Sequence, residues 1–253
     1  MKIDYYAYRS GMRKWNAGFK VLLALGTLCL VIGFNRIGVS LFVAVVMGSL
    51  TLAVGKLPAR VYLHYLTVPL VFMIVSVLMI IMEFSTGPIG EWNLSLGLFY
   101  VGVTRQGFLM GIRVFFRALA GVSALYMMAF STPMNEFIFV LQKAHLPEIL
   151  VELMHLIYRF IFILLSVAEE MQTAARARLG YRNLGQGFRT FAMVAGNLFL
   201  TALRRAGIYY DAMIARGYDG TLAFLTEERP IRLWQGIGAT VYFALIVVIF
   251  FMS

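Results

Sequence analysis

The chain has 253 residues, of which 61% are hydrophobic and only 13% are charged. A soluble domain carries about 25% charged residues, so this composition excludes an ordinary soluble domain or a self-contained soluble enzyme. The formal net charge of +10 could suggest a nucleic-acid partner. The sequence contains no recognised nucleic-acid-binding module, and an excess of Lys and Arg is typical of the cytoplasmic loops of a membrane protein.

The first half of the chain alternates basic segments with long apolar blocks. Residues 1–20 hold five basic side chains against Asp4 alone, so the positive-inside rule places the N-terminus in the cytoplasm, beside the cell (inner) membrane. Residues 83–104 carry no Lys or Arg, as expected of an outer loop. The apolar blocks suit a hydrocarbon layer about 30 Å thick. They predict four membrane-crossing helices, at residues 21–34 with flanking residues, 37–54, 66–82 and 106–130.

The second half of the chain is dominated by arginine. Residues 168–232 hold nine Arg, no Lys and six acidic residues, which predicts a cytoplasmic segment. A crossing at 149–167 would place that segment outside, and the crossing itself would carry Glu152, His155 and Arg159, which are costly in lipid. We therefore predict that 149–167 does not span the membrane.

Helical patterns complete the prediction. A short helix is expected at 134–144, long cytoplasmic or interfacial helices at 149–178 and 188–216, and a fifth span at 234–252 that leads outward. The predicted fold class is all-α, a polytopic membrane bundle of about five spans with a cytoplasmic module of long helices. The expected domains are residues 1–130, with the first four spans, 131–232, with the module, and 233–253, with the last span.

One short motif occurs twice, as Ala177-Arg178-Leu179-Gly180-Tyr181 and Ala215-Arg216-Gly217-Tyr218-Asp219. Each copy falls at the end of a predicted helix, where Gly180 or Gly217 is expected to take the left-handed cap conformation. Ordinary helix caps would explain either copy alone. Two matched copies favour two equivalent docking points, at which each guanidinium pairs with a carboxylate of a partner.

These paired motifs resemble those of the transmembrane, or T, component of energy-coupling factor transporters. Further segments narrow the resemblance to the cobalt branch, the CbiQ family, and extend it over nearly the whole chain. They are Ile3-Asp4-Tyr5-Tyr6-Ala7-Tyr8, Ser131-Thr132-Pro133-Met134-Asn135-Glu136, Pro147-Glu148-Ile149-Leu150-Val151-Glu152-Leu153-Met154, Ile157-Tyr158-Arg159-Phe160-Ile161-Phe162 and Glu169-Glu170-Met171.

The resemblance implies a subunit that joins other proteins. Its partners would be two cytoplasmic ATPase subunits (CbiO-like), a substrate-binding membrane subunit (CbiM-like) and a small accessory membrane subunit (CbiN-like), all in a lipid bilayer. The long cytoplasmic helices would be coupling helices, and the cargo, Co²⁺ or the Ni²⁺ of a related branch, would bind elsewhere. The residues that match the ATPase-docking role are Ala177, Arg178, Leu179, Ala215, Arg216 and Gly217. Arg176, in an overlapping Ala-Arg-Ala, is the alternative first docking arginine.

Two further sets of residues lie within helices. Arg113 and Arg117 share a face of the fourth span, and arginine inside a membrane segment marks a functional interface, here a candidate subunit interface, unless the two snorkel or pair within the bundle. Gly107 and Gly111 permit close helix contact, more often within the chain than with another subunit.

The main alternatives are a self-sufficient secondary transporter and an intramembrane metalloenzyme. The first would need acidic residues or broken helices at mid-depth, and the spans contain no Asp or Glu well inside. The second would use Glu152 and His155, one helical turn apart, but a metal site needs more ligands than these. No Walker loop and no Ser-His-Asp or Cys-His set is evident. We therefore expect no catalytic residues, no metal ligands and no cofactor.

Overall fold

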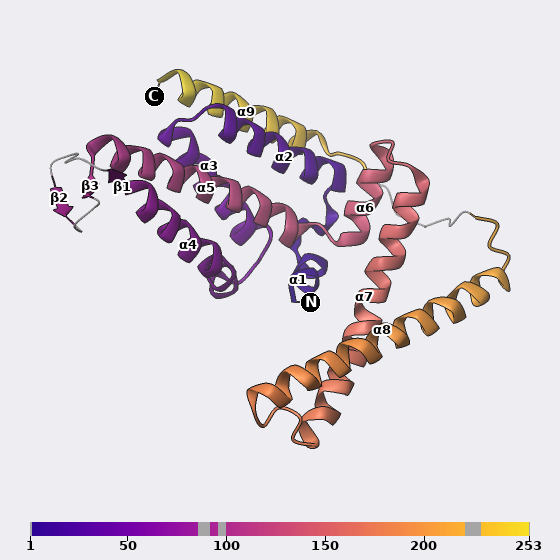
Figure 1. Ribbon diagram of the computed structural model, residues 1–253. Coiled ribbons are helices and arrows are strands. Elements are labelled where there is room, and N and C mark those ends of the chain that lie inside the picture. The colour runs from indigo at the N-terminus through magenta and orange to yellow at the C-terminus, as the bar shows by residue number, and fades with distance from the viewer. Residues whose placement is uncertain (1, 86–91, 96–99, 221–228, 253) are drawn as a thin grey trace. The chain divides into compact units, whose positions relative to one another are not determined.

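The computed structural model describes residues 2–85, 92–95, 100–220 and 229–252. These residues form mostly helices (Figure 1), so the helical fold class predicted from composition is confirmed. The helices are α1 (Lys2–Arg9), the 3-10 helix η1 (Gly11–Lys14), α2 (Ala17–Gly33), α3 (Ile37–Ser49), the π-helix η2 (Leu50–Val54), α4 (Ala59–Ile81), α5 (Arg105–Ser131), α6 (Met134–Lys143), α7 (Glu148–Ala177), α8 (Leu184–Ile214) and α9 (Leu233–Met252). The strands are β1 (Met82–Ser85), β2 (Trp92–Ser95) and β3 (Tyr100–Val103).

The chain forms two compact units, which are described separately. Unit 1 comprises Met1–Phe137 and Glu227–Ser253, and unit 2 comprises Ile138–Thr226. The chain therefore leaves unit 1 within α6 and returns to it shortly before α9.

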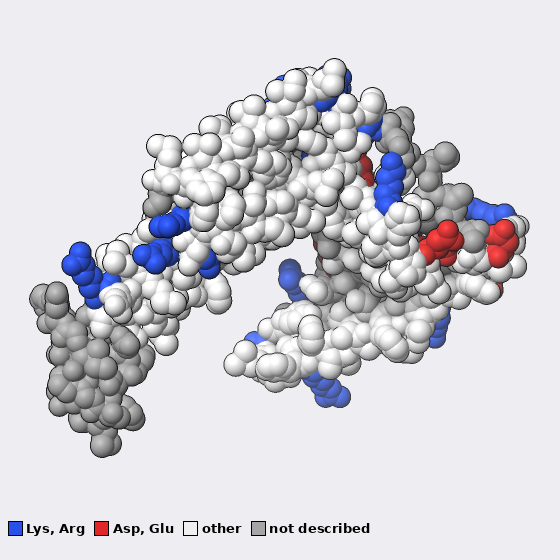
Figure 2. All heavy atoms as spheres, turned by 90° about the horizontal axis from the view of Figure 1, so that it is seen from above, with Lys and Arg blue, Asp and Glu red and all other residues white. Residues whose placement is uncertain are grey.

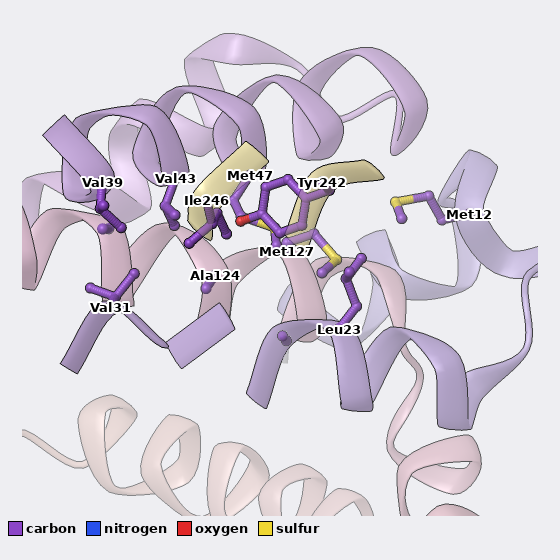
Figure 3. Packing of buried hydrophobic residues seen from close by; sticks show 12 residues of the cluster. Met12, Leu23, Val31, Val39, Val43, Met47, Ala124, Met127, Tyr242 and Ile246 are labelled. Carbon is purple, nitrogen blue, oxygen red and sulfur yellow. The ribbon is translucent and has the colours of Figure 1, made fainter. Parts of the chain in front are cut away.

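Helix α5 lies at the centre of unit 1. Helices α2, α3 and α4 pack against it, and α9 packs against α3 (Figure 1). Buried side chains of α2, α3, α5 and α9 form one hydrophobic cluster, in which Met47, Met127 and Ile246 are fully enclosed (Figure 3). Buried side chains of α4 pack with Phe130 of α5 in a second cluster. The small residues Ala120 and Ala124 of α5 are also fully buried, which allows the neighbouring helices to approach closely.

Among the described residues, five helices are long and apolar enough to cross a membrane, and α2 is apolar but shorter. The five are Ile37–Val54, Ala59–Ile81, Arg105–Ser131, Glu148–Ala177 and Leu233–Met252. Helix α2 has 17 residues, so it is about 26 Å long against a hydrocarbon layer of about 30 Å. Broad stretches of the visible surface carry no charged side chain (Figure 2), as expected of a surface that faces lipid.

The sequence-based count of spans included α2 and left out α7. By length and hydropathy α7 also qualifies. Its exclusion rests on the charge of the segment that follows and on Glu152, His155 and Arg159 within the helix, so it stays a prediction. Pro69, expected near the start of the third span, lies ten residues inside α4, which begins at Ala59.

The predicted outer loop at 83–104 contains a small antiparallel sheet in its described part. Strand β3 lies between β1 and β2, with Gly102 opposite both Glu83 and Asn93. The sequence analysis did not predict these strands, because four residues are too few to show a clear alternation of polar and apolar side chains. It also missed α1 and η1, which lie in the segment interpreted only as a basic N-terminus.

Unit 2 is built largely from α7 and α8, which pack against each other. Near the connecting turn, the Thr190 hydroxyl donates a hydrogen bond to the carbonyl of Gly180 at 2.7 Å. Farther along, the Arg159 guanidinium donates to the Tyr209 hydroxyl and lies 5.0 Å from the centre of its ring. Both helices begin and end within four residues of the predicted bounds, 149–178 and 188–216.

Candidate functional site

The first candidate arginine lies where α7 ends. Arg178 is the C-cap residue, and Leu179 follows it with a φ of 58°, in the left-handed region. The Gly180 amide donates to the carbonyl of Ala175 at 2.9 Å, and the Leu179 amide donates to the carbonyl of Arg176 at 3.0 Å. This pair of hydrogen bonds is a Schellman motif, which satisfies carbonyl groups that a helix C-terminus leaves unpaired.

The second candidate arginine lies where α8 ends, in the same backbone geometry. The Tyr218 amide donates to the carbonyl of Met213, and the Gly217 amide donates to the carbonyl of Ile214, both at 3.0 Å. Gly217 has a φ of 83°. Arg216 directly precedes this left-handed residue, as Arg178 does in the first copy.

This shared geometry sets the register of the two copies. In each, an alanine and then an arginine precede the left-handed residue of a Schellman motif. Arg178 is therefore the structural equivalent of Arg216, whereas Arg176 lies two residues earlier, inside α7. The sequence alone left these two registers open.

The expectation that Gly180 is left-handed is wrong, since Leu179 holds that conformation. Glycine is required at position 180 for a different reason, which is the lack of space for a Cβ atom. A Cβ atom there would lie 2.9 Å from both the carbonyl oxygen of Ala175 and the hydroxyl of Thr190. Glycine thus allows the end of α7 to approach α8, whereas at Gly217 it serves the positive φ, as predicted.

Both guanidinium groups are available to a partner. The side chains of Arg178 and Arg216 are exposed, and neither forms a hydrogen bond or ion pair with another residue that the structure describes. The adjacent Ala177 and Ala215 are also exposed and present little bulk. The negative end of each helix dipole stabilises the arginine, whose planar fork can then bind a carboxylate through two hydrogen bonds.

A groove of about 580 Å³ lies between α7 and α8, and Arg178 lines it. The α7 side contributes Met171, Ala174 and Ala175, and the α8 side ends at Arg204. The groove is open and mainly apolar, with a guanidinium from each helix. Its chemistry suits an apolar segment with an acidic group, and it contains no set of residues for bond cleavage.

Two polar residues inside α7 contact α8 or the segment after it. Glu152 accepts a hydrogen bond from the Tyr218 hydroxyl at 3.4 Å, and Arg159 binds Tyr209 as described above. Among the described residues, no group of three or more His, Cys, Asp or Glu side chains could hold a metal ion. The pair Glu152 and His155 is therefore not supplemented by further ligands in that part of the chain.

The two candidate interface glycines of α5, Gly107 and Gly111, pack within the chain. A Cβ atom on Gly111 would lie 3.1 Å from Ile81 and 3.2 Å from Val77, and one on Gly107 would lie 3.3 Å from the Ile80 carbonyl oxygen. This is the contact within the chain that the sequence analysis favoured, so their face of α5 is covered by α4.

The two candidate interface arginines of α5 differ in their surroundings. Arg113 is exposed, whereas Arg117 is half-buried. The Nε atom of Arg117 is buried and has no hydrogen-bond partner among the described residues. The pairing inside the bundle that the sequence allowed for Arg117 is therefore not observed at this atom.

Sequence reasoning assigned no role to Lys20. It was counted with the basic N-terminus, yet its side chain is fully buried in α2 and bonded to residues more than a hundred positions away. Its place directly before an apolar block was the available signal, but that pattern is the same for a lysine that faces the cytoplasm.

The fold and these arginines define a class: a helical membrane protein whose second unit carries two equivalent helix ends, each with an exposed arginine. Comparison with known proteins is consistent with this class. Residues 9–226 match the model of the family CbiQ, described as cobalt transport protein. The chain belongs to the CbiQ family, which comprises transport proteins rather than enzymes.

Several curated relatives cover most of the chain. The Salmonella typhimurium cobalt transport protein CbiQ is 30% identical over 235 residues, which is 92% of this chain and 97% of the relative. An uncharacterised protein of Methanocaldococcus jannaschii is 31% identical over 90% of this chain and 85% of its own length. A putative fused cobalt transport protein CbiMQ of Methanocorpusculum labreanum is 29% identical over 96% of this chain, and the match covers 41% of that protein.

Proposed function

We propose that this chain is the energy-coupling membrane subunit of an ECF-type importer for cobalt. In this role it transmits movement from two cytoplasmic ATPase subunits to a separate membrane subunit that binds the metal. The observation that carries the proposal is the pair of matched Schellman caps, each with an exposed arginine in the same position. Two equivalent docking groups suit two copies of one ATPase.

The mechanism follows from the positions of the arginines. ATP binding closes the ATPase dimer, and each docked arginine moves with its ATPase subunit. Because Arg178 ends α7 and Arg216 follows α8, both long helices are displaced together. Their displacement tilts or releases the substrate-binding subunit. The arginines attach the two helices to the ATPase subunits, and the partner carries out ATP hydrolysis.

The relatives support the choice of cargo and partner. The Salmonella protein is named for cobalt transport, and the fused CbiMQ protein joins a CbiQ part to a CbiM part in one chain. A CbiM-like subunit is therefore the expected membrane partner. The basic residues of 168–232 favour a cytoplasmic location for the docking groups, with the N-terminus on the same side.

The test is assembly and transport with the docking arginines changed. Losing one side of a desolvated charged contact typically costs about 2–5 kcal/mol, and about 1.4 kcal/mol is a tenfold change in affinity. Arg178→Ala and Arg216→Ala should each weaken co-purification of the ATPase, and the double variant should abolish ATP-driven Co²⁺ uptake. Lysine at either position should restore only part of the activity, because a point charge cannot replace the planar fork.

Arg176→Ala is the matched control. It removes an arginine two residues from Arg178 while leaving the Schellman cap intact, so its effect should be mild. A severe Arg176 variant beside a silent Arg178 variant would move the first docking point by two residues. Full Co²⁺ uptake by the Arg178/Arg216 double variant would refute the coupling role, and uptake of Ni²⁺ in preference to Co²⁺ would change the cargo alone.

A further inference from the structure

Lys20 is the largest fully buried side chain of the described residues, and it is charged. Its Nζ atom donates to the carbonyl of Ser131 at 2.7 Å, at the end of α5. The same atom lies 3.2 Å from the Oε2 atom of Glu136, in the first turn of α6. One side chain of α2 therefore holds the end of α5 and the start of α6.

A second connection reaches the segment before α9. The Arg229 guanidinium lies 3.9 Å from the other carboxylate oxygen of Glu136. The carbonyl of Arg229 accepts a hydrogen bond of 2.6 Å from the Asn16 side chain, whose oxygen also caps α2 through the Phe19 amide at 3.0 Å. Glu136 is thus shared between a buried lysine and an arginine more than ninety residues farther along the chain.

A third connection comes from α1. A carboxylate oxygen of Asp4 accepts a hydrogen bond of 3.3 Å from the Met134 amide, the first of α6, where the positive end of the helix dipole favours a negative charge. The Asn135 side chain donates to the Tyr8 hydroxyl at 3.3 Å. Burial and then the charges of Asp4 and Glu136 raise the pKa of Tyr8 above its ordinary value.

These contacts join two segments that contain neither of the docking arginines. The N-terminal segment that contains Asp4 and Tyr8 meets the segment 131–136, and Lys20 and Arg229 complete the cluster. We call Lys20, Glu136, Arg229, Asn16 and Asp4 the α6 clasp. All of its members belong to unit 1.

The clasp lies beside both points at which the chain passes between unit 1 and unit 2. The chain leaves unit 1 after Phe137, one residue beyond Glu136, and returns at Glu227, two residues before Arg229. The clasp therefore holds both segments through which unit 1 is connected to unit 2. These two segments are the covalent connections between the units, so movement of unit 2 can be passed to unit 1 through them.

Stability alone does not account for the buried charge. Removing a lysine from water is costly, and replacing a buried ion pair by apolar side chains is often neutral or stabilising. A hydrophobic pair at 20 and 136 would bury these positions without that cost. Unlike an apolar pair, the charged group specifies one geometry, because Lys20 must meet both a carbonyl and a carboxylate.

We propose that the α6 clasp positions the two chain crossings so that movement of unit 2 is passed to α2 and α5, with Lys20 as the central positioning residue of energy coupling. The inference rests on the coupling role proposed above. Breaking the clasp uncouples ATP hydrolysis from transport, and it leaves the docking arginines and the ATPase contact intact.

The first measurement is hydrogen exchange of the full-length chain in lipid nanodiscs, followed by mass spectrometry. The variants are Lys20→Met and Glu136→Gln, with Thr27→Val as the matched control. Thr27 is also fully buried in α2, but its hydroxyl donates to the Leu23 carbonyl of the same helix and interacts with the Tyr242 hydroxyl of α9, and among the described residues it bonds to neither the end of α5 nor α6. In both clasp variants the amides at the start of α6 should exchange faster, whereas α3 and α4 should be unchanged. The control should leave α6 as in the wild type.

The second measurement is the number of Co²⁺ ions taken up per ATP hydrolysed by the assembled complex in vesicles. The clasp variants should retain the ATPase during purification and should hydrolyse ATP. Their ratio of Co²⁺ to ATP should fall by on the order of tenfold, the change that corresponds to about 1.4 kcal/mol of lost coupling. Lys20→Arg, which keeps the charge, should recover part of the ratio.

Three results would overturn the inference. The first is unchanged exchange at the start of α6 in both clasp variants. The second is faster exchange spread equally over all helices, which would make the cluster a general stabiliser. The third is a wild-type ratio of Co²⁺ to ATP despite a loosened α6. If the wild-type complex itself shows no ATP-driven uptake, the proposed function fails instead, and the exchange result still reports on the clasp.

Discussion

Leu179 holds a backbone conformation that is costly for any residue with a Cβ atom. Its φ is 58°, while the equivalent position in the second cap is a glycine with a φ of 83°. Left-handed geometry costs a non-glycine residue about 1–2 kcal/mol. Leu179 is 67% exposed, so its side chain contributes little burial in return. The two caps have the same backbone geometry, but only the second has glycine at the left-handed position.

Leu179→Gly should therefore stabilise the chain. We expect a gain of about 0.5–1 kcal/mol, because relief of the left-handed strain outweighs the greater unfolded-state entropy of glycine. Thermal unfolding in detergent would measure it as a higher midpoint temperature. Leu179→Ala keeps the Cβ atom and should give no gain, while Gly217→Ala should lower the midpoint. An unchanged or lower midpoint for Leu179→Gly would mean that the leucine side chain contributes more than its exposure suggests.

The half-buried arginine of α5 is a second position whose role can be tested by itself. Arg117 has a buried Nε atom without a partner among the described residues, and such an atom is costly unless a partner protein satisfies it. If Arg117 faces the substrate-binding subunit, Arg117→Ala should reduce capture of that subunit while the ATPase remains bound. Co-purification of each partner measures this, and the exposed Arg113 provides the matched control as Arg113→Ala.

The outcome for Arg117 separates an interface from a structural role. A loss of folded yield without selective loss of the membrane partner would place the side chain in the packing of the bundle. Normal yield and normal capture together would remove Arg117 from the interface.

At the scale of whole elements, apolar length and charge predicted most of the helices. The blocks at 37–54 and 234–252 became α3 with η2 and α9, and the long helices of unit 2 fell close to their expected bounds. Local pattern is sufficient here because a membrane-crossing or amphipathic helix carries its signal in consecutive residues. The paired arginines were found for the same reason, since each copy lies within five consecutive residues.

Other features depend on contacts that no local pattern contains. The burial of Lys20 is visible only once the end of α5 and the start of α6 are placed beside α2. The left-handed Leu179 contradicts a reasonable preference for glycine, because the helix end determines the backbone there and the residue adapts to it. The short strands β1, β2 and β3 likewise follow from pairing across the chain rather than from their own sequences.

The contact between α4 and α5 gives a prediction at this scale. A Cβ atom on Gly111 would already lie 3.1 Å from Ile81, so Gly111→Val should force the two helices apart. Overpacking of this kind typically costs about 1–3 kcal/mol. The folded fraction recovered by size-exclusion chromatography should fall. Gly33→Val is the control, because nothing lies within 4 Å of the corresponding atom, and equal recovery of both variants would contradict the close α4–α5 contact.

At the scale of the whole molecule, the roles of α2 and α7 decide how the chain is arranged across the membrane. If α2 crosses and α7 does not, the chain has five spans, residues 168–232 are cytoplasmic and the C-terminus is outside. If α7 also crosses, the count becomes six and both of these locations reverse. The arginine-rich composition of 168–232 favours five, because basic segments are retained in the cytoplasm.

Single cysteines distinguish the two arrangements. They would be introduced at Asn183, which is exposed between α7 and α8, and at Ser253, which lies outside the described residues. The natural Cys29 is exposed and must first be replaced by serine. With five spans, a membrane-impermeant thiol reagent should label position 253 in intact cells and should label position 183 only after permeabilisation. The reverse pattern would show that α7 spans the membrane, and it would place both docking arginines on the side that no cytoplasmic ATPase can reach.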